Sequence, residues 1–340
     1  MFYQIFSFGL VYLSVFLAIS SSSWISSWVA MELGSIGFLP ILSWNGSLMS
    51  KLSAWKYFLV QAISSSVFLF SILGISGSFF SNWQELSNDF FSFILMASIF
   101  MKMGIFPFHG WLISVVENCS WMKFFIISTV QKVVPLCIFF NLSFSSTLGN
   151  WISYFWLSCS VLMSLSCFFE NSTRKFLTFS SMLNISWVCL AINLESALAF
   201  FFFFSYTFTL FSCCLLFQSS SVYFQSDFFF LESSSWSSKF LKVTLMGSLC
   251  GLPPFAGFFP KLLVLQEILN SFKFHLVPFL FLFSSSVMVL FYLPFFSSSG
   301  VLAQKKGSLS HLEGWGSFTF FSYLFSSLLL FFPFLMFFFW

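Results

Sequence analysis

Long apolar runs follow one another along almost the whole chain, each ended by serine, asparagine, glycine or charged residues. A run of about 20 apolar residues is long enough to cross a bilayer as one helix. The runs predict about eleven spanning helices, with tryptophans clustered near their ends. The division between the seventh and eighth spans rests only on Asn193 and Glu195. The predicted spans are residues 3–20, 24–44, 56–78, 90–114, 121–141, 150–170, 175–193, 195–217, 244–270, 274–296 and 317–338.

The fourth and ninth spans are long and interrupted by glycine and proline. The fourth contains IFMKMGIFPFHGWL (Ile99–Leu112), which places Lys102 and His109 beside the break, and the ninth contains GLPPFAGFFPK (Gly251–Lys261). A membrane tolerates such breaks only where the freed backbone groups are satisfied inside the protein. Two interpretations of the first break stay open: an ion or proton path beside a buried charge, or a structural kink whose lysine extends to the interface.

The positions of the two broken spans predict an internal repeat. Spans one to five and spans six to ten form two sets, and the broken helix is the fourth in each. An odd number of helices per repeat inverts the second copy, as in secondary transporters. We therefore expect an all-α membrane protein with two inverted five-helix repeats. These are residues 1–145 (broken helix about 90–114) and 146–298 (broken helix about 244–270), followed by a connection and a C-terminal transmembrane helix in residues 299–340.

Composition agrees with this architecture. Hydrophobic residues make up 59% of the 340 residues and charged residues only 7%, whereas a soluble domain carries roughly 25% charged residues. The chain enters an apolar run directly, without a positively charged or Arg-rich leader. It is therefore expected either to be inserted from its first helix during synthesis or to be made inside the organelle where it works. Membrane lipids are expected partners, and nucleic acid is not.

The basic residues in the connections and at the ends of the predicted spans lie almost entirely on one side of the membrane. If the N-terminal side is called side A, nine basic residues fall on side A and only Lys273 falls on the other side. The positive-inside rule makes side A the cytoplasm or the mitochondrial matrix, and eleven spans place the C-terminus opposite. The nine are Lys51, Lys56, Lys123, Arg174, Lys175, Lys239, Lys242, Lys305 and Lys306.

Four ionisable residues lie well inside predicted spans: Glu32, Lys102, Lys132 and Lys261. Each costs about 2.5–3.5 kcal/mol at mid-membrane, so we expect pairing or hydration. Glu32 with Lys102 is the expected ion pair. Because burial weakens a lysine's hold on its proton and an approaching carboxylate strengthens it, movement of Glu32 relative to Lys102 would load or release a proton. The alternative is that these charges only join helices.

Lys132 lies in STVQKVVPL, where Pro135 is expected to weaken the helix and admit water. Together with Lys102, Lys261 and Glu267 it would form a lateral hydrated row. His109 either bridges a gap in this row or simply hydrogen-bonds the broken helix.

Metal and redox chemistry are not indicated. None of the eight cysteines forms a C-x-x-C pair, the three histidines are widely separated, and no Gly-rich nucleotide loop is present. We interpret the cysteines as small buried residues and expect no redox cofactor in this chain.

Four stretches carry a family resemblance: KMGIFPFHGWL, SWMKFFIISTVQKVVPL, SAWKYFLVQAISS and GSLCGLPPFAGFFPKLLVLQEIL. They resemble the subunit 2 family of mitochondrial NADH:ubiquinone oxidoreductase, respiratory complex I, and their order and spacing match most clearly from Glu32 to about Glu267. The resemblance implies an antiporter-like, proton-translocating subunit of the mitochondrial inner membrane. It implies an N-terminus in the matrix and a C-terminus in the intermembrane space. Animal members typically lack three helices of the longer bacterial form, which agrees with eleven spans.

The resemblance also implies residue roles and partners. Glu32 and Lys102 would form an ion pair, Lys132 would be the central relay, and Lys261 would lie on the path to one side of the membrane. NADH, FMN, iron–sulfur clusters and ubiquinone would be bound elsewhere in the complex, and the implied neighbours are subunit 4, subunit 4L and accessory subunits. One departure is Asn184 in SSMLNISW, where the family usually has a histidine. Asparagine cannot carry a proton, although it can orient water.

Two other functions stay open. A free-standing cation/proton antiporter of the same fold would need no docking partners and should be stable when purified alone. A structural membrane spacer would tolerate apolar replacement of its mid-membrane charges, as buried ion pairs sometimes do.

Overall fold

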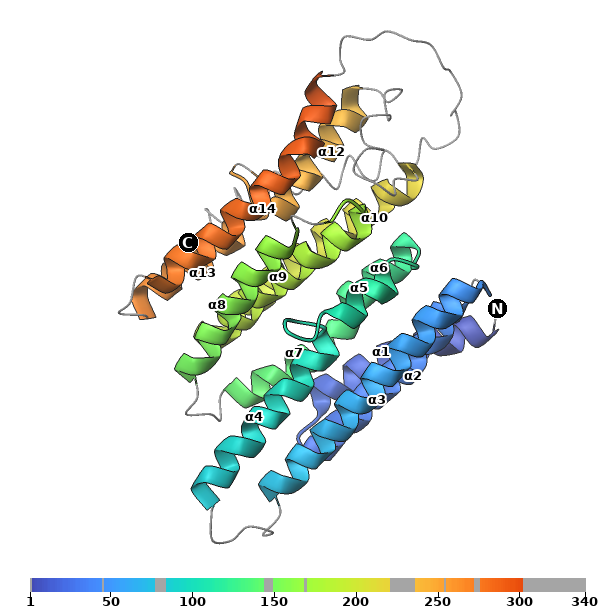
Figure 1. Cartoon of the computed structure of the whole chain (residues 1–340), viewed down its shortest axis with the longest axis vertical. Helices are drawn as coiled ribbons and strands as arrows, with labels where there is room; N and C mark the ends of the chain where they lie inside the picture. Colours follow the sequence, from blue (N-terminus) through green and yellow to red (C-terminus); the bar gives the residue numbers. More distant parts are fainter. Residues whose placement is uncertain are drawn as a thin grey trace. The chain divides into compact units, whose positions relative to one another are not determined.

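The computed structural model describes residues 2–44, 46–76, 84–143, 149–167, 170–220, 236–253, 255–271 and 276–301 (Figure 1). The secondary-structure elements in these ranges are α-helices, which confirms the expected all-α class. The chain divides into two compact units, Met1–Gly149 and Asn150–Trp340.

In the first unit, neighbouring helices in sequence pack side by side. Helix α1 packs on α2, α2 on α3, and α3 on α4 (Figure 1). Helix α7 contacts α1, α2 and α4 and therefore lies in the middle of this unit. The helices are α1 (Phe2–Ser20), α2 (Trp24–Ser43), α3 (Leu48–Ser76), α4 (Gln84–Met103), α5 (Gly110–Val116), α6 (Trp121–Ser128) and α7 (Val130–Ser143).

The second unit is built around α9. Every residue of α9 from Phe176 to Ile192 is buried, as expected for a helix that is surrounded by protein on all sides. It packs against α10 and α13, which also contact each other. The helices are α8 (Gly149–Ser166), α9 (Thr173–Leu194), α10 (Ser196–Ser220), α12 (Trp236–Cys250), α13 (Phe258–Ser271) and α14 (Leu276–Val301).

Several predicted spans can be compared with these helices. Six helical stretches in the described residues are long and apolar enough to cross a membrane. The predicted division at Asn193 and Glu195 is confirmed, since α9 ends at Leu194 and α10 begins at Ser196. The last predicted span, 317–338, lies outside the described residues.

The helix of the predicted span 121–141 is interrupted at Thr129, whereas the sequence predicted a weak point at Pro135. Thr129 separates α6 from α7 with φ −121° and ψ −74°, whereas Pro135 lies inside α7. The Thr129 hydroxyl and the Thr129 backbone N–H both donate to the Phe125 carbonyl, at 2.7 and 3.0 Å, so the last turn of α6 is closed at this residue. The weak point is therefore at Thr129, and Lys132 lies in the first turn of the helix that follows.

Serine hydroxyls within the helices are satisfied by their own helix. Ser14 donates to the Val11 carbonyl at 2.6 Å, and Ser98 donates to the Leu95 carbonyl at 2.6 Å. The same three-residue step recurs through both units. Because a satisfied hydroxyl needs no partner on another helix, a serine-rich chain can still form helices that pack through apolar contacts.

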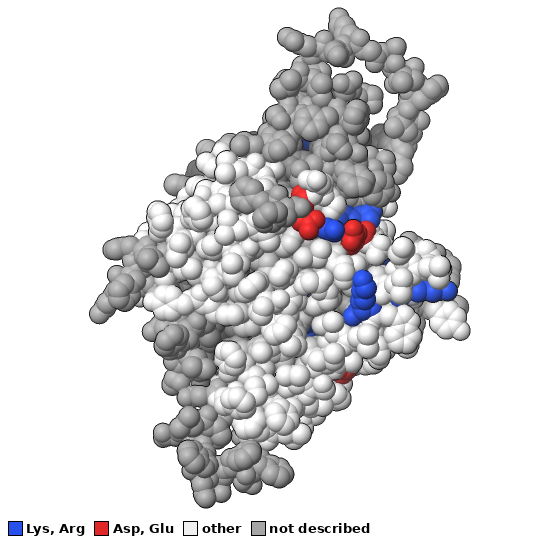
Figure 2. Space-filling model, in the orientation of Figure 1, with Lys and Arg blue, Asp and Glu red and all other residues white. Residues whose placement is uncertain are grey.

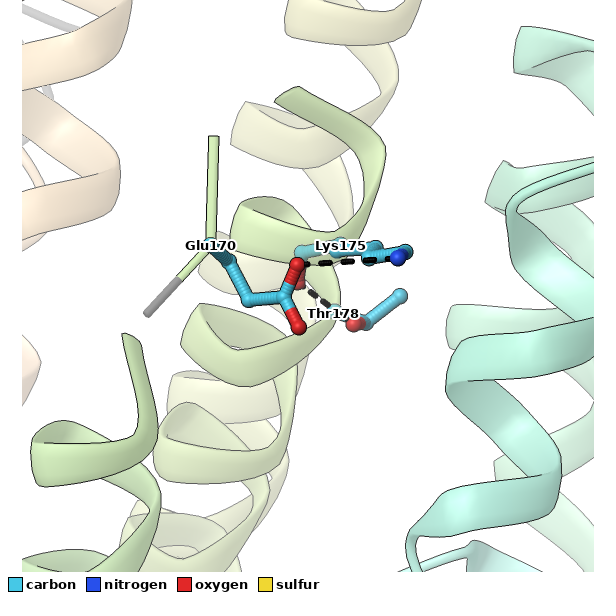
Figure 3. Close-up of polar contacts among 3 residues, drawn as sticks. All are labelled: Glu170, Lys175 and Thr178. Carbon is cyan, nitrogen blue, oxygen red and sulfur yellow. Dashed lines mark hydrogen bonds and ion pairs between the residues drawn. The ribbon is translucent and has the colours of Figure 1, made fainter. Parts of the chain in front are cut away.

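Charged side chains are few on the described surface. Uncharged side chains cover most of the face shown in Figure 2. At the start of α9, Lys175 Nζ lies 3.7 Å from Glu170 Oε2, and the Thr178 hydroxyl donates to the Lys175 carbonyl at 2.6 Å (Figure 3). Both charged side chains are about a quarter exposed, so this pair contributes at most about 1 kcal/mol.

Candidate functional site

A small cavity in the first unit brings two of the predicted lysines together. Its polar lining and size suit about one water molecule. Lys102 from α4 and Lys132 from α7 both face it, and their side chains are only 7% and 2% exposed. The lining residues are Met31, Gly34, Tyr57, Gln61, Lys102, Met103, Trp111, Leu112, Ile127, Gln131, Lys132, Val134 and Pro135.

The end of α4 places Lys102 at this cavity. Gly104 has a φ of +66°, a conformation that favours glycine. Its N–H donates to the Met101 carbonyl at 3.2 Å, and the Ile105 N–H donates to the Phe100 carbonyl at 3.1 Å. This pair of bonds is typical of a helix ended by glycine. Lys102 therefore lies in the last turn of α4, where the helix dipole favours a cation.

Side chains also donate to carbonyls at this helix end. The Trp111 indole N–H donates to the Met101 carbonyl at 3.1 Å. The Gln61 amide donates to the Lys102 carbonyl at a longer 3.5 Å. The carbonyls of Phe100, Met101 and Lys102 thus find partners within the protein, as backbone groups freed inside a membrane require.

The Lys102 ammonium is buried, and it makes no hydrogen bond to the described residues. Glu32 on α2 is half buried, and no ion pair joins it to Lys102 among the described residues. The expected direct ion pair is therefore not formed in this structure. A buried ammonium without a hydrogen bond is costly, so a water molecule or an approaching carboxylate would stabilise it.

A short hydrogen-bond chain positions α7 beside α2 and α3. The Tyr57 hydroxyl donates to Gln131 Oε1 at 3.2 Å, and Gln131 Nε2 donates to the Gly34 carbonyl at 3.2 Å. With both ends of its amide bonded, Gln131 has one preferred orientation. It holds the neighbouring Lys132 at the cavity.

The second unit contains a smaller cavity around Lys261. The side chain of Lys261 is 6% exposed, and its ammonium donates to the Cys250 carbonyl at 2.8 Å. The cavity suits about one water molecule. It is lined by Asn184 from α9, by Phe202, Ser205, Tyr206 and Thr209 from α10, by Ser248 and Leu249 from α12, and by Gly257, Pro260 and Lys261.

The end of α12 resembles the end of α4. Gly251 follows the helix with a φ of +79°, and the Leu252 N–H donates to the Gly247 carbonyl at 3.1 Å. This bond spans five residues, as does the bond made by Ile105 at the first break. Lys261 then reaches back to the last carbonyl of α12, the negative end of the helix. Lys102 thus lies in the last turn of a helix that stops at glycine, and Lys261, from the first turn of α13, brings its ammonium to the end of another such helix.

The structure places His109 and Glu267 outside the described lining of both cavities. His109 precedes α5 and stacks on Phe106 with ring centroids 5.8 Å apart. Glu267 lies further along α13 than Lys261 and is half buried.

Lys123 was expected, from the sequence, at the membrane-surface end of the span 121–141, and it is buried in the structure. Its side chain is 8% exposed, and its ammonium donates to the Leu42 carbonyl near the end of α2 at 2.9 Å. The partner lies 81 residues earlier in the chain, so no local pattern indicated this contact.

The eight cysteines are free, and seven of them are buried, as expected for small packing residues. Within the described ranges, no three His, Cys, Asp or Glu side chains come together as a metal-binding group.

Known proteins resemble this chain in both sequence and fold. The family described as NADH:quinone oxidoreductase/Mrp antiporter, TM, matches residues 21–290. NADH-ubiquinone oxidoreductase chain 2 of Anopheles gambiae is 33% identical over 255 residues, which cover 74% of this chain and 72% of that protein. The protein of the same name from Artemia franciscana is 32% identical over 260 residues, covering 75% of this chain and 77% of that protein.

Two solved structures share the fold. A chain of respiratory complex I from Thermus thermophilus with bound aureothin superimposes with a TM-score of 0.83 at 18% identity, covering 97% of this chain and 77% of that chain. A chain of the Mrp complex from Dietzia sp. superimposes with a TM-score of 0.75 at 13% identity, covering 95% of this chain and 73% of that chain.

Proposed function

Because this chain belongs to the NADH:quinone oxidoreductase/Mrp antiporter membrane family, we propose that it is a proton-translocating membrane-arm subunit of respiratory complex I. The relatives named NADH-ubiquinone oxidoreductase chain 2 support this assignment over most of the chain. The observation that carries the proton-translocating role is the cavity shared by Lys102 and Lys132, since two buried lysines that face one space large enough for a water molecule suit proton transfer.

In this proposal Glu32, Lys102, Lys132 and Lys261 are the relay groups. Lys102 has no hydrogen bond to the described residues, and Glu32 lies on α2 of the same unit. If Glu32 approaches, the ammonium form of Lys102 is stabilised; if it withdraws, Lys102 releases its proton more readily. Water in the shared cavity would carry that proton towards Lys132. His109 and Glu267 are secondary candidates, and they do not line either cavity among the described residues.

Electron transfer from NADH to ubiquinone would take place in other subunits, which would hold FMN and the iron–sulfur clusters. The chain would thus contribute to the enzyme NADH:ubiquinone reductase (H⁺-translocating) without redox chemistry of its own. Its neighbours would be subunit 4, subunit 4L, accessory subunits and lipids of the mitochondrial inner membrane. The bias of basic residues supports an N-terminus in the matrix and a C-terminus in the intermembrane space.

We also propose that the two units are inverted repeats, residues 1–145 and 146–298, with a C-terminal helix after them. The similar helix ends at Gly104 and Gly251 support this relation, because each stops a helix beside a buried lysine.

A free-standing cation/proton exchanger is the second candidate, and the fold shared with the Mrp complex is compatible with it. The 33% identity to a protein named NADH-ubiquinone oxidoreductase chain 2 favours the complex I assignment.

The test is Lys132→Met in the assembled complex, with NADH oxidation and proton uptake followed together and assembly checked on a native gel. Proton uptake should fall, and oxidation should fall with it through coupling. Lys175→Met is the matched control, since it removes an equal charge from a partly exposed site. Full assembly with unchanged oxidation and proton stoichiometry in Lys132→Met would show that Lys132 is structural.

A further inference from the structure

One face of α3 is not covered by its own unit. The helix packs against α2, α4 and α5, and side chains such as Tyr57, Gln61 and Phe68 are buried. On the other face, large apolar side chains recur at the three- and four-residue steps that keep residues on one side of a helix, with the exposed Ser66 completing the series. These side chains, each more than half exposed, form what we call the outer stripe: Leu52, Trp55, Leu59, Ile63, Phe70 and Leu73.

The outer stripe is as long as the apolar core of a membrane. From Leu52 to Leu73 an α-helix rises about 32 Å, and the hydrocarbon core of a bilayer is about 30 Å thick. The Ser66 hydroxyl donates to the Ile63 carbonyl at 2.8 Å within its own helix, so it needs no outside partner. The stripe therefore presents a continuous surface that suits hydrocarbon.

Two exposed lysines flank the stripe where α3 begins. A helix turns by about 100° per residue, so Lys51 and Lys56 lie about 140° apart around the helix axis, with Leu52 and Trp55 between them. Neither lysine forms an ion pair with the described residues, and the first turn of α3 contains no acidic residue. This end of the stripe thus offers two positive charges to an anionic partner.

The residues of the stripe favour a lipid over a helix of another protein as that partner. Interfaces between membrane helices are enriched in small residues, which let two backbones approach closely. On α3 such residues face its own unit: Ala54 is buried, and Gly74 lies against the Phe91 ring of α4. The outer stripe consists of large side chains, and Trp55 is of the type that lies at the level of lipid headgroups.

We propose that the outer stripe of α3 binds an anionic phospholipid. Two helices precede α3, so the lipid belongs to the leaflet on the N-terminal side of the membrane. Its phosphate lies between Lys51 and Lys56, Trp55 lies beside the glycerol group, and the acyl chains extend along the rest of the stripe. This inference goes beyond the proposed function, because binding of the lipid does not depend on proton translocation.

The test uses the whole complex in phosphatidylcholine nanodiscs that contain phosphatidylglycerol with a photoreactive group in its acyl chain. Illumination should label residues 59–73 of α3. Unlabelled phosphatidylglycerol should compete for this site, whereas added phosphatidylcholine should not. Raising the salt concentration should weaken the labelling, since the lysines lie at the membrane surface, where salt screens their charges.

Variants of the two lysines measure the selection of the headgroup. Lys51→Gln and Lys56→Gln should each lower the affinity for phosphatidylglycerol about fivefold, and the double variant about thirtyfold. Lys175→Gln is the matched control, because it removes an equal charge from the second unit, where Lys175 pairs with Glu170. It should leave the labelling of α3 unchanged.

Three results would overturn the proposal: displacement by phosphatidylcholine as well as by phosphatidylglycerol, unchanged labelling in the double variant, or a map of the complex in which another subunit covers the outer stripe. If the double variant does not assemble, the competition experiment on the unmodified complex decides. Proton uptake in Lys132→Met tests the proposed function separately, so either proposal can fail while the other stands.

Discussion

Replacing Gly251 with alanine is expected to displace the Lys261 ammonium from the carbonyl that it caps. A Cβ atom at Gly251 would lie 2.8 Å from Lys261 Nζ and 2.9 Å from its Cδ, which is closer than ordinary van der Waals contact. The lysine must therefore move, and its hydrogen bond to the Cys250 carbonyl is lost.

The magnitude has two parts. Alanine at a φ of +79° costs about 1–2 kcal/mol, and the lost charge-assisted hydrogen bond costs about 1.5–3 kcal/mol. The total is about 2.5–5 kcal/mol. Gly46→Ala is the matched control, since Gly46 has a φ of +65° and a Cβ added there would meet no atom within 4 Å. It should show the backbone cost alone.

The assay measures the amount of assembled complex, the midpoint of thermal inactivation of NADH oxidation, and proton uptake per NADH. Gly251→Ala should lower all three more than Gly46→Ala does, and Gly46→Ala should leave proton uptake per NADH unchanged. Equal effects of the two substitutions would refute the reasoning, because they would show that the contact with Lys261 does not matter.

Two further predictions concern residues that hold the helices in place. Lys123→Met removes the ammonium that donates to the Leu42 carbonyl, so the free energy of unfolding should fall by about 1.5–3 kcal/mol. A native gel should show less assembled complex, while proton uptake per NADH in the assembled fraction stays unchanged. A loss of proton uptake in that fraction would instead place Lys123 in the relay. In Gly257→Ala the added Cβ would clash with the Ser248 carbonyl oxygen, so the second unit should not fold and the complex should not assemble. Normal assembly on the same gel would show that this close backbone approach is absent.

Features that depend on local residue types were predictable from the sequence. A helix end at Gly104 or Gly251 follows from glycine and proline in an apolar run. The burial of Lys102, Lys132 and Lys261 follows from the length of apolar sequence on both sides of each lysine. Helix ends and lysine burial depend on residues nearby in the chain, so the pattern of apolar and polar residues was sufficient to predict them.

Features that depend on tertiary contacts were not predictable. Lys123 lies near the start of an apolar run, as an interfacial lysine does, yet it reaches a carbonyl 81 residues away. The weak point before Lys132 lies at Thr129, where the backbone leaves the helical conformation although neither glycine nor proline stands there. The placement of Asn184 in the same cavity as Lys261 depends on how α9 packs against α10 and α13.

The serine hydroxyls that bond within their own helices bear on how this chain can change over time. A serine hydroxyl that donates to the carbonyl three residues earlier in its own helix needs no hydrogen-bond acceptor on a neighbouring helix. Exchange between serine and alanine at such positions should therefore alter packing very little. Because alanine and serine codons differ by a single base in many cases, these helices can follow a drift in the base composition of their gene without losing their ability to reside in a membrane.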